Sequence, residues 1–197
     1  MQTCEYDGDF VSEVRSHPWT DATGHPEFRY YDLTRDPSQI RTMLEDYLPW
    51  SRYAAVEKFY TLIAAINRAE FALESNDCEF TGPEANHSAA VAKRMMCSGR
   101  VMVFFRCLER NICAENVLEL RLKLHVALAS GDPDFRWGVV GTTIVPVRYL
   151  AVRGGAVGTQ LMISFWAWGD TESENMDNLG RVFGNLSAAM GAGGMEI

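Results

Sequence analysis

Residues 137–168 read WGVVGTTIVPVRYLAVRGGAVGTQLMISFWAW, and this stretch decides the fold. Its two apolar segments, 137–151 and 159–168, are rich in β-branched and aromatic residues, which is typical of strands. The glycine-rich run 153–158 between them predicts a loose loop, so the two strands should be neighbours in one sheet. Pro146 predicts a bulge or an edge position, because proline has no N–H to donate to the strand ladder.

A helix is predicted directly after the second strand. Thr171 and Glu174 have the spacing of a capping box, in which the two residues satisfy each other's free backbone N–H groups. Apolar residues then recur at helical spacing on one stripe, namely Met176, Leu179, Val182, Phe183, Leu186 and Met190. Residues 191–197 are expected to form a disordered tail.

Two helices are predicted in the first third of the chain. Asp36 and Pro37 have the order of an N-cap and a first helical residue, and Pro49 should end that helix. Ser51 is expected to cap a second helix, whose apolar face is formed by Tyr53, Val56, Phe59, Tyr60, Ile63 and Ile66. The corner between them predicts a helix hairpin or an elbow.

Residues 116–129 carry contradictory signals. Apolar and polar residues alternate with period two, as in a half-buried strand. The residue types are nevertheless the strong helix formers, and Gly131 and Pro133 follow as a helix stop. We predict a helix here, with an amphipathic strand as the alternative.

The remaining central segments are shorter. A short strand is predicted within 71–80, followed by a turn at 81–83. Asn86 is expected to cap a short helix reaching Met95, and residues 100–108 alternate clearly enough to predict a strand.

This order of elements predicts an α+β fold. It is expected to be a single-domain sandwich, with an antiparallel or mixed sheet of about four to five strands and helices packed mainly on one face. Residues 1–34 show no sustained period and should form an N-terminal arm packed on the body, with one short strand near 28–33. Residues 35–190 should form the single domain.

Composition narrows the class of protein. The chain has 197 residues and a formal net charge of −8, with 47% hydrophobic and 22% charged residues, which is typical of a globular protein. No stretch approaches the ~20 apolar residues of a membrane span, and the acidic start is unlike a secretory signal. The odd number of cysteines, 5, without a C-x-x-C pair, suits a reducing compartment. We therefore expect a cytoplasmic protein.

The large catalytic and nucleotide-binding motifs are missing. The sequence contains no G-x-x-x-x-G-K-[ST], no H-E-x-x-H and no G-x-S-x-G motif. The glycines at 154–158 lead into a strand and not into a helix, so they do not predict a phosphate site. No catalytic residue, no cofactor and no metal is predicted.

The densest polar cluster lies in 70–87, and its candidate partner-binding carboxylates are Glu74, Asp77, Glu79 and Glu84. The ordinary interpretation is a solvated acidic loop. Such oxygen-rich loops also bind Ca²⁺ or Mg²⁺, but the spacing here matches no EF-hand. As a recognition surface, the cluster suits a basic partner.

Trp166 and Trp168 are the candidate aromatic anchors. Being two residues apart on a strand, they should share one face with Ser164 and Met162. Their rings either anchor an interface or cover the end of the core. Trp137 and Tyr149 on the preceding strand are expected to extend this aromatic patch.

These features together predict a non-enzymatic protein-binding module. Its natural form is an acidic inhibitor, of the immunity or anti-defence type, that blocks a basic surface of a protein partner. Negative charge disfavours direct binding to nucleic acid or to a membrane. A homo-oligomer is compatible with the sequence. The alternative is a small enzyme or ligand-binding domain with a pocket between sheet and helices.

Overall fold

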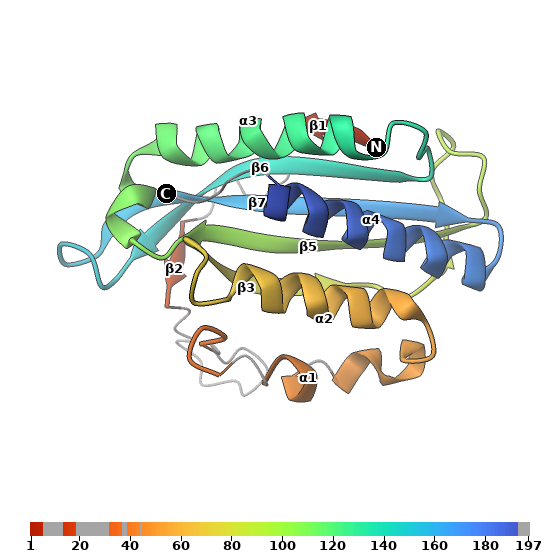
Figure 1. The fold of residues 1–197 in the computed structure, drawn as a ribbon, viewed down its shortest axis with the longest axis horizontal. Coiled ribbons are helices and arrows are strands. Elements are labelled where there is room, and N and C mark those ends of the chain that lie inside the picture. Colours follow the sequence, from red (N-terminus) through yellow and green to blue (C-terminus); the bar gives the residue numbers. More distant parts are fainter. Residues whose placement is uncertain (6–13, 19–31, 37–38, 44, 193–197) are drawn as a thin grey trace.

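The computed structural model describes residues 1–5, 14–18, 32–36, 39–43 and 45–192. In these ranges the chain forms a seven-stranded mixed sheet whose main path has the order β1-β6-β7-β5-β3 (Figure 1). The α+β class is confirmed, whereas the predicted four to five strands are too few. The strands are β1 (Gln2–Glu5), β2 (Arg15–His17), β3 (Leu73–Phe80), β4 (Glu84–Ala85), β5 (Met95–Phe105), β6 (Gly138–Tyr149) and β7 (Ala156–Gly169).

The helices are α1 (Gln39–Met43), α2 (Ala54–Ile66), α3 (Ala114–Gly131) and α4 (Glu172–Ala192), with 3-10 turns η3 (Glu45–Trp50) and η4 (Leu108–Ile112). Figure 1 shows α2, α4 and α3 side by side on one face of the sheet, over β3, β7 and β1 respectively. None of the described helices combines the length and the apolar character needed to cross a bilayer.

β6 and β7 form a long antiparallel hairpin, so the two strands are neighbours in the sheet, as the sequence predicts. Its register runs without a shift from Gly138 opposite Ala167 to Tyr149 opposite Ala156. On the other side of β6, two short strands pair in parallel: β1 with 139–142 and β2 with 147–149. Pro146 falls between these two stretches, where a missing N–H costs no strand hydrogen bond on that side.

The main core lies between the helices and the sheet. Phe183 of α4 contacts Phe59 of α2 and Phe165 of β7, with ring centroids 5.0 and 5.1 Å apart. Phe80 of β3 joins the same cluster at 5.1 Å from Phe59. The aromatic rings therefore bind two helices and two strands into one apolar unit.

Two helix predictions are confirmed in detail. The ambiguous segment 116–129 is helical, within α3, and buries Val117, Leu120, Leu124 and Leu128. At the start of α4 the Thr171 hydroxyl accepts from the Glu174 N–H at 3.2 Å. The Glu174 carboxylate accepts from the N–H of Asp170, one residue before the expected partner, at 2.8 Å.

Other local predictions are wrong. Ser51 does not cap α2, since its hydroxyl donates to the Leu48 carbonyl and α2 begins after Tyr53. Asn86 caps no helix: its amide donates to the carbonyls of Val91 and Lys93 and closes a loop between β4 and β5. These side chains bond backbone groups of loops, which local sequence patterns do not distinguish from helix caps.

The N-terminal arm contributes strands that the sequence did not predict. β1 and β2 lie in it, and both pair with β6. The strand predicted near 28–33 falls mostly outside the described residues, as do residues 193–197 of the predicted tail. Residues 191–192 belong to α4.

Candidate functional site

The sheet face opposite α2, α3 and α4, here called the distal face, carries every candidate site residue. Along β5, Val101 and Val103 belong to the helix-side core, so Arg100 and Met102 point to the distal face. Cross-strand neighbours share a face, which places the remaining strand residues by register. The residues so gathered are Glu74, Asp77, Glu79, Glu84, Trp166 and Trp168.

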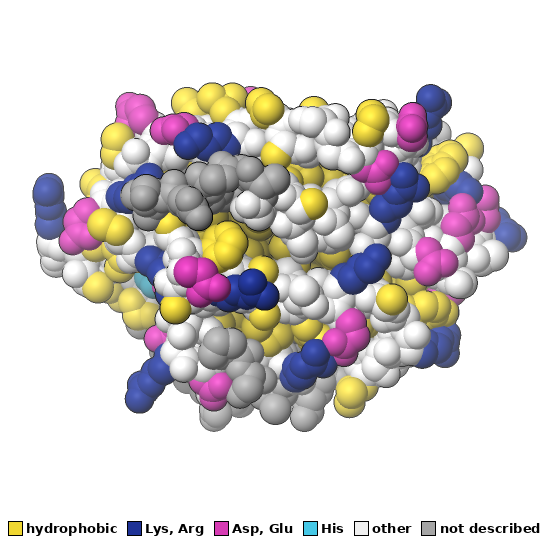
Figure 2. Space-filling model, in the orientation of Figure 1, with side chains coloured by type: hydrophobic (Ala, Val, Ile, Leu, Met, Phe, Trp, Pro, Cys, Tyr) yellow, Lys and Arg dark blue, Asp and Glu magenta, His cyan; other side chains and the backbone are white. Residues whose placement is uncertain are grey.

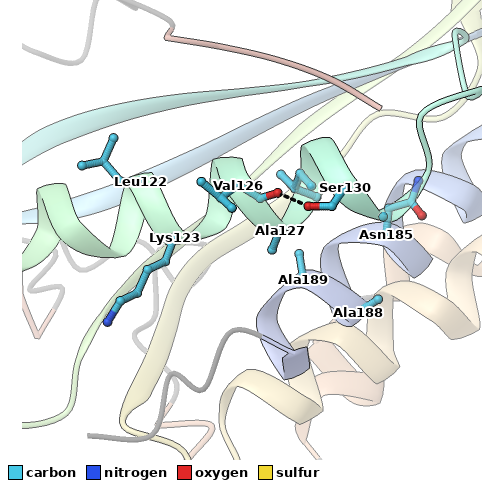
Figure 3. Close-up of a pocket in the computed structure, with 10 residues that line it drawn as sticks. Leu122, Lys123, Val126, Ala127, Ser130, Asn185, Ala188 and Ala189 are labelled. Carbon is cyan, nitrogen blue, oxygen red and sulfur yellow. Dashed lines mark hydrogen bonds between the residues drawn. The ribbon is translucent and has the colours of Figure 1, made fainter.

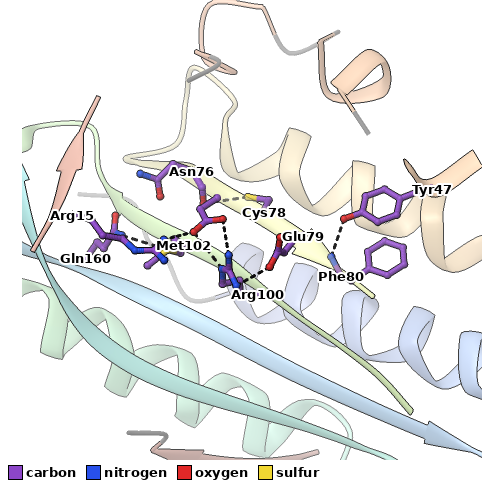
Figure 4. Close-up of polar contacts among 10 residues, drawn as sticks. Arg15, Tyr47, Asn76, Cys78, Glu79, Phe80, Arg100, Met102 and Gln160 are labelled. Atoms are coloured by element: carbon purple, nitrogen blue, oxygen red, sulfur yellow. Dashed lines mark hydrogen bonds and ion pairs between the residues drawn. The ribbon is translucent and has the colours of Figure 1, made fainter. Parts of the chain in front are cut away.

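Four charged side chains form an ion-pair network on this face (Figure 4). The Arg100 guanidinium donates to both carboxylate oxygens of Asp77, at 3.1 and 3.2 Å, and pairs with Glu79 at 2.7 Å. Arg15 of β2 reaches Asp77 from the other side. Two guanidiniums thus flank one carboxylate, and strands far apart in the sequence are tied together.

The backbone explains how Asp77 reaches both arginines. The β3–β5 register shifts between Asn76 and Glu79, and Asp77 there has a φ of 47°. Aspartate is among the few residues that tolerate this left-handed conformation. Asn76 is on the distal face, so regular alternation would place the next side chain, Asp77, on the helix side. The irregularity turns Asp77 onto the distal face instead.

Arg100 stays charged although it is largely buried. Burial alone would lower the pKa of Arg100, but hydrogen bonding and the charges of Asp77 and Glu79 outweigh it, so the pKa is raised. The side chains of Arg15, Asp77 and Arg100 are only 13%, 23% and 23% exposed. An ion pair at such depth is screened less by salt than a surface pair.

A pocket of about 240 Å³ opens beside the network. Its wall combines a carboxylate, a guanidinium, three hydroxyls and an indole ring, from Glu79, Thr81, Ser98, Gly99, Arg100, Met162, Ser164 and Trp166. The Glu79 side chain is 54% exposed there. The pocket can accept hydrogen bonds and positive charge at one side and a flat or aliphatic group against the ring.

Trp168 and Glu84 lie beyond the pocket, on the row shared with Met96. Trp168 is buried, so it supports this end of the face, whereas Glu84 is exposed. Trp137 is next to Trp168, whose backbone N–H donates to the Trp137 carbonyl at 3.0 Å. Tyr149 is at the far end of β6, buried against Phe104, so its predicted place in the tryptophan patch is wrong.

The sequence-based reasoning missed the two arginines of the network. Arg100 begins the alternating segment that predicts a strand, and a charged side chain in that pattern indicates a polar site on one face of the strand. Arg15 had no such signal, because its partner Asp77 is 62 positions away in the sequence. The ordinary interpretation of the acidic segment 70–87 is a solvated loop with a short strand, but residues 73–80 within it all belong to strand β3.

The described residues contain no cluster of three or more His, Cys, Asp or Glu side chains that could hold a metal ion. A largely apolar groove of about 640 Å³ runs between α3 and α4 (Figure 3). It lies between two helices, and so differs from the predicted pocket between sheet and helices.

Comparison of the chain with protein-family models, with curated proteins and with solved structures found no match.

Proposed function

We propose that this chain is a non-enzymatic protein-binding module that docks a basic partner on the distal face of its sheet. One observation carries the proposal: Glu79 and Trp166, from strands far apart in the sequence, border the same pocket. A carboxylate beside an aromatic ring is the arrangement that receives a lysine or arginine side chain.

Charge balance supports a basic partner. Among the described strand residues placed on the distal face above, the carboxylates of Glu74, Asp77, Glu79 and Glu84 outnumber the guanidiniums of Arg15 and Arg100. The other face differs, because Figure 2 shows acidic and basic side chains interspersed over the helices. An excess of one sign on one face steers a partner of opposite charge toward it.

Arg100 also fixes the position of the carboxylate proposed to bind the partner. Arg100 holds the Glu79 carboxylate at 2.7 Å, so this carboxylate is positioned before any partner arrives. A group that is already ordered loses less entropy on binding.

Such a module is suited to inhibition. A protein that covers a basic channel or active-site surface needs carboxylates to match the charge and a few apolar anchors to desolvate the contact. We therefore propose that the partner is a basic enzyme surface, blocked in the manner of an immunity or anti-defence protein.

Binding of a decalysine peptide to the full chain tests this proposal. Isothermal titration calorimetry at low and at physiological salt should show binding by the wild type that weakens as salt rises. Glu79→Gln with Glu84→Gln should weaken it at least fivefold. The matched control is Glu115→Gln, an exposed carboxylate on α3, which should leave the affinity unchanged. Equal effects of the distal and the α3 substitutions would overturn the proposal.

A further inference from the structure

Helix α3 carries an apolar stripe on its outer side, formed by Leu118, Leu122 and Val126. Their exposed fractions are 37%, 54% and 70%. The residues recur every four positions, so they lie one above another along the helix over about 12 Å. Figure 2 shows hydrophobic side chains along this border of the molecule. Contiguous apolar surface of this kind usually marks an interaction site.

The alternating sequence of 116–129 explains the stripe. On a helix, a period of two places apolar residues on two different sides. One set, Val117, Leu120, Leu124 and Leu128, packs in the core. The stripe residues face another side and are not needed for packing within the described part of the chain.

Neighbouring contacts leave the stripe accessible. α3 is the outermost helix, over β1 at the edge of the sheet (Figure 1). Arg121 pairs with Glu5 of β1, and the His125 ring bonds the Thr142 hydroxyl of β6 at 2.7 Å, so these side chains turn toward the sheet. On the side facing α4 lies the groove, where Leu122 and Val126 form the α3 rim (Figure 3).

The charges beside the stripe match a second copy of the chain. Glu119 and Lys123 lie on the groove side of the stripe, paired with each other at 2.7 Å and half-exposed or more. In an antiparallel pair of α3 helices centred on Leu122, this flank meets the same flank of the other copy. Glu119 of each copy then lies only about 3 Å along the axis from Lys123 of the other, counting 1.5 Å per residue.

We infer that the chain forms a two-fold symmetric dimer through α3, with the two helices antiparallel and Leu122 on the axis. Leu118 of one copy packs against Val126 of the other, and Leu122 against its own counterpart. Each Glu119 pairs across the interface with Lys123, as an isologous contact requires. This interface is on the helix side of the molecule, away from the distal face of the sheet.

Small residues beside the rim permit close approach. Ala127 of α3 and Ala188 and Ala189 of α4 line the groove, and their short side chains leave room beside Leu122 and Val126. The apolar surface buried is modest, so we expect a weak dimer that forms over the micromolar concentration range.

Disulfide cross-linking tests the geometry. Leu122→Cys lies on the axis and should form dimers when oxidised, whereas Val126→Cys is about 12 Å from its counterpart and should not. Leu118→Cys combined with Val126→Cys should cross-link again. Wild type is the control for its own exposed cysteines. Cross-linking at all single positions would indicate parallel helices, and none at any position would indicate no α3 contact; either result overturns the inference.

Sedimentation velocity over a range of concentrations tests the energetics. Leu122→Glu should weaken association at least tenfold, while Leu150→Glu, at a site 41% exposed beside the β6–β7 turn, should not. Glu119→Lys or Lys123→Glu alone should weaken it severalfold, and the two together should restore it. Circular dichroism checks that each variant is folded. A wild type that stays monomeric, or a double variant no better than the single ones, contradicts the dimer.

Discussion

Asp77 and Arg100 hold each other across the β3–β5 pair, with both carboxylate oxygens bonded to the guanidinium at 3.1 and 3.2 Å. Arg15 contacts the same carboxylate on the same face, from β2, which pairs with β6. The Asp77–Arg100 pair links the edge strand β3 to its neighbour β5, and Arg100 also orders Glu79 at the rim of the pocket. It is thus both a structural tie and part of the proposed binding surface.

Asp77→Asn should lower the free energy of unfolding by about 1–3 kcal/mol, because it removes the charged carboxylate that two partly buried guanidiniums share. Asparagine keeps the size and tolerates the left-handed backbone, so the substitution tests charge and not strain. Urea denaturation measures the change. Glu57→Gln breaks the exposed bidentate pair with Arg41 and should produce no measurable change. If both substitutions lowered the free energy of unfolding equally, burial of the Asp77 ion pairs would not add to their stabilising effect.

Acid should destabilise the fold through His17. Burial, opposed by the charge of Asp32, lowers the pKa of His17 to about 4 from an ordinary 6.5. The unfolded chain therefore binds the proton more readily than the folded chain. The stability that depends on neutral His17 is fully present above pH 6.5 and is lost as the pH falls toward 4. Because one proton is involved, the folding equilibrium constant falls by at most roughly tenfold for each pH unit.

Urea denaturation at pH 7, 6 and 5 measures this dependence. His17→Gln should be flatter over that range than wild type. Some slope should remain, because burial and the charge of Arg121 also lower the pKa of His125. An unchanged slope in His17→Gln would contradict the assignment.

Gly99→Ala should destabilise the sheet at the pocket. A Cβ at this position would be 2.3 Å from the Glu79 carbonyl and 2.6 Å from the Phe80 Cα, so β3 must move away from β5. We expect a loss of about 1–3 kcal/mol in thermal or urea denaturation. Gly184→Ala is the control: a Cβ there meets nothing within 4 Å, and helix propensity should add up to about 1 kcal/mol.

Thiol reactivity should divide the cysteines into two classes. Burial raises the pKa of Cys78 and of Cys97 to about 12, and both thiols pack within the fold. Cys4, Cys107 and Cys113 are exposed. A chromogenic disulfide reagent at pH 8 should therefore modify three thiols in the folded chain and all five in denaturant. Rapid reaction of Cys97, identified by mass spectrometry, would contradict the packing of β5 against α4.

Long local patterns in the sequence were reliable. The capping residues Thr171 and Glu174 and the stripe behind them predict α4, because a helix closes its hydrogen bonds within a few residues. Residues 116–129 form a helix as their composition predicts, although their period suggested a strand. Helix propensity prevailed because the core needed only one of the two apolar sides.

Local sequence patterns do not predict which distant segments pair with each other. β5 begins at Met95, where a short helix was predicted, because residues 95–103 find hydrogen-bond partners on β7. β1 and β2 are strands only through their parallel pairing with β6, and their own residues show no alternation. Such partners come from the assembled sheet, and in these three pairings the paired residues lie more than fifty positions apart in the sequence.

The candidate site divides along the same line. Its acidic and aromatic residues, and the shared face of Trp166 and Trp168, follow from composition and from the two-residue period of a strand. That the carboxylates and the indole meet on one face, and that Arg15 and Arg100 bind Asp77 there, depends on strand order and register. Side-chain type and local period are properties of short segments, whereas charge neighbours across a sheet exist only once the chain has folded.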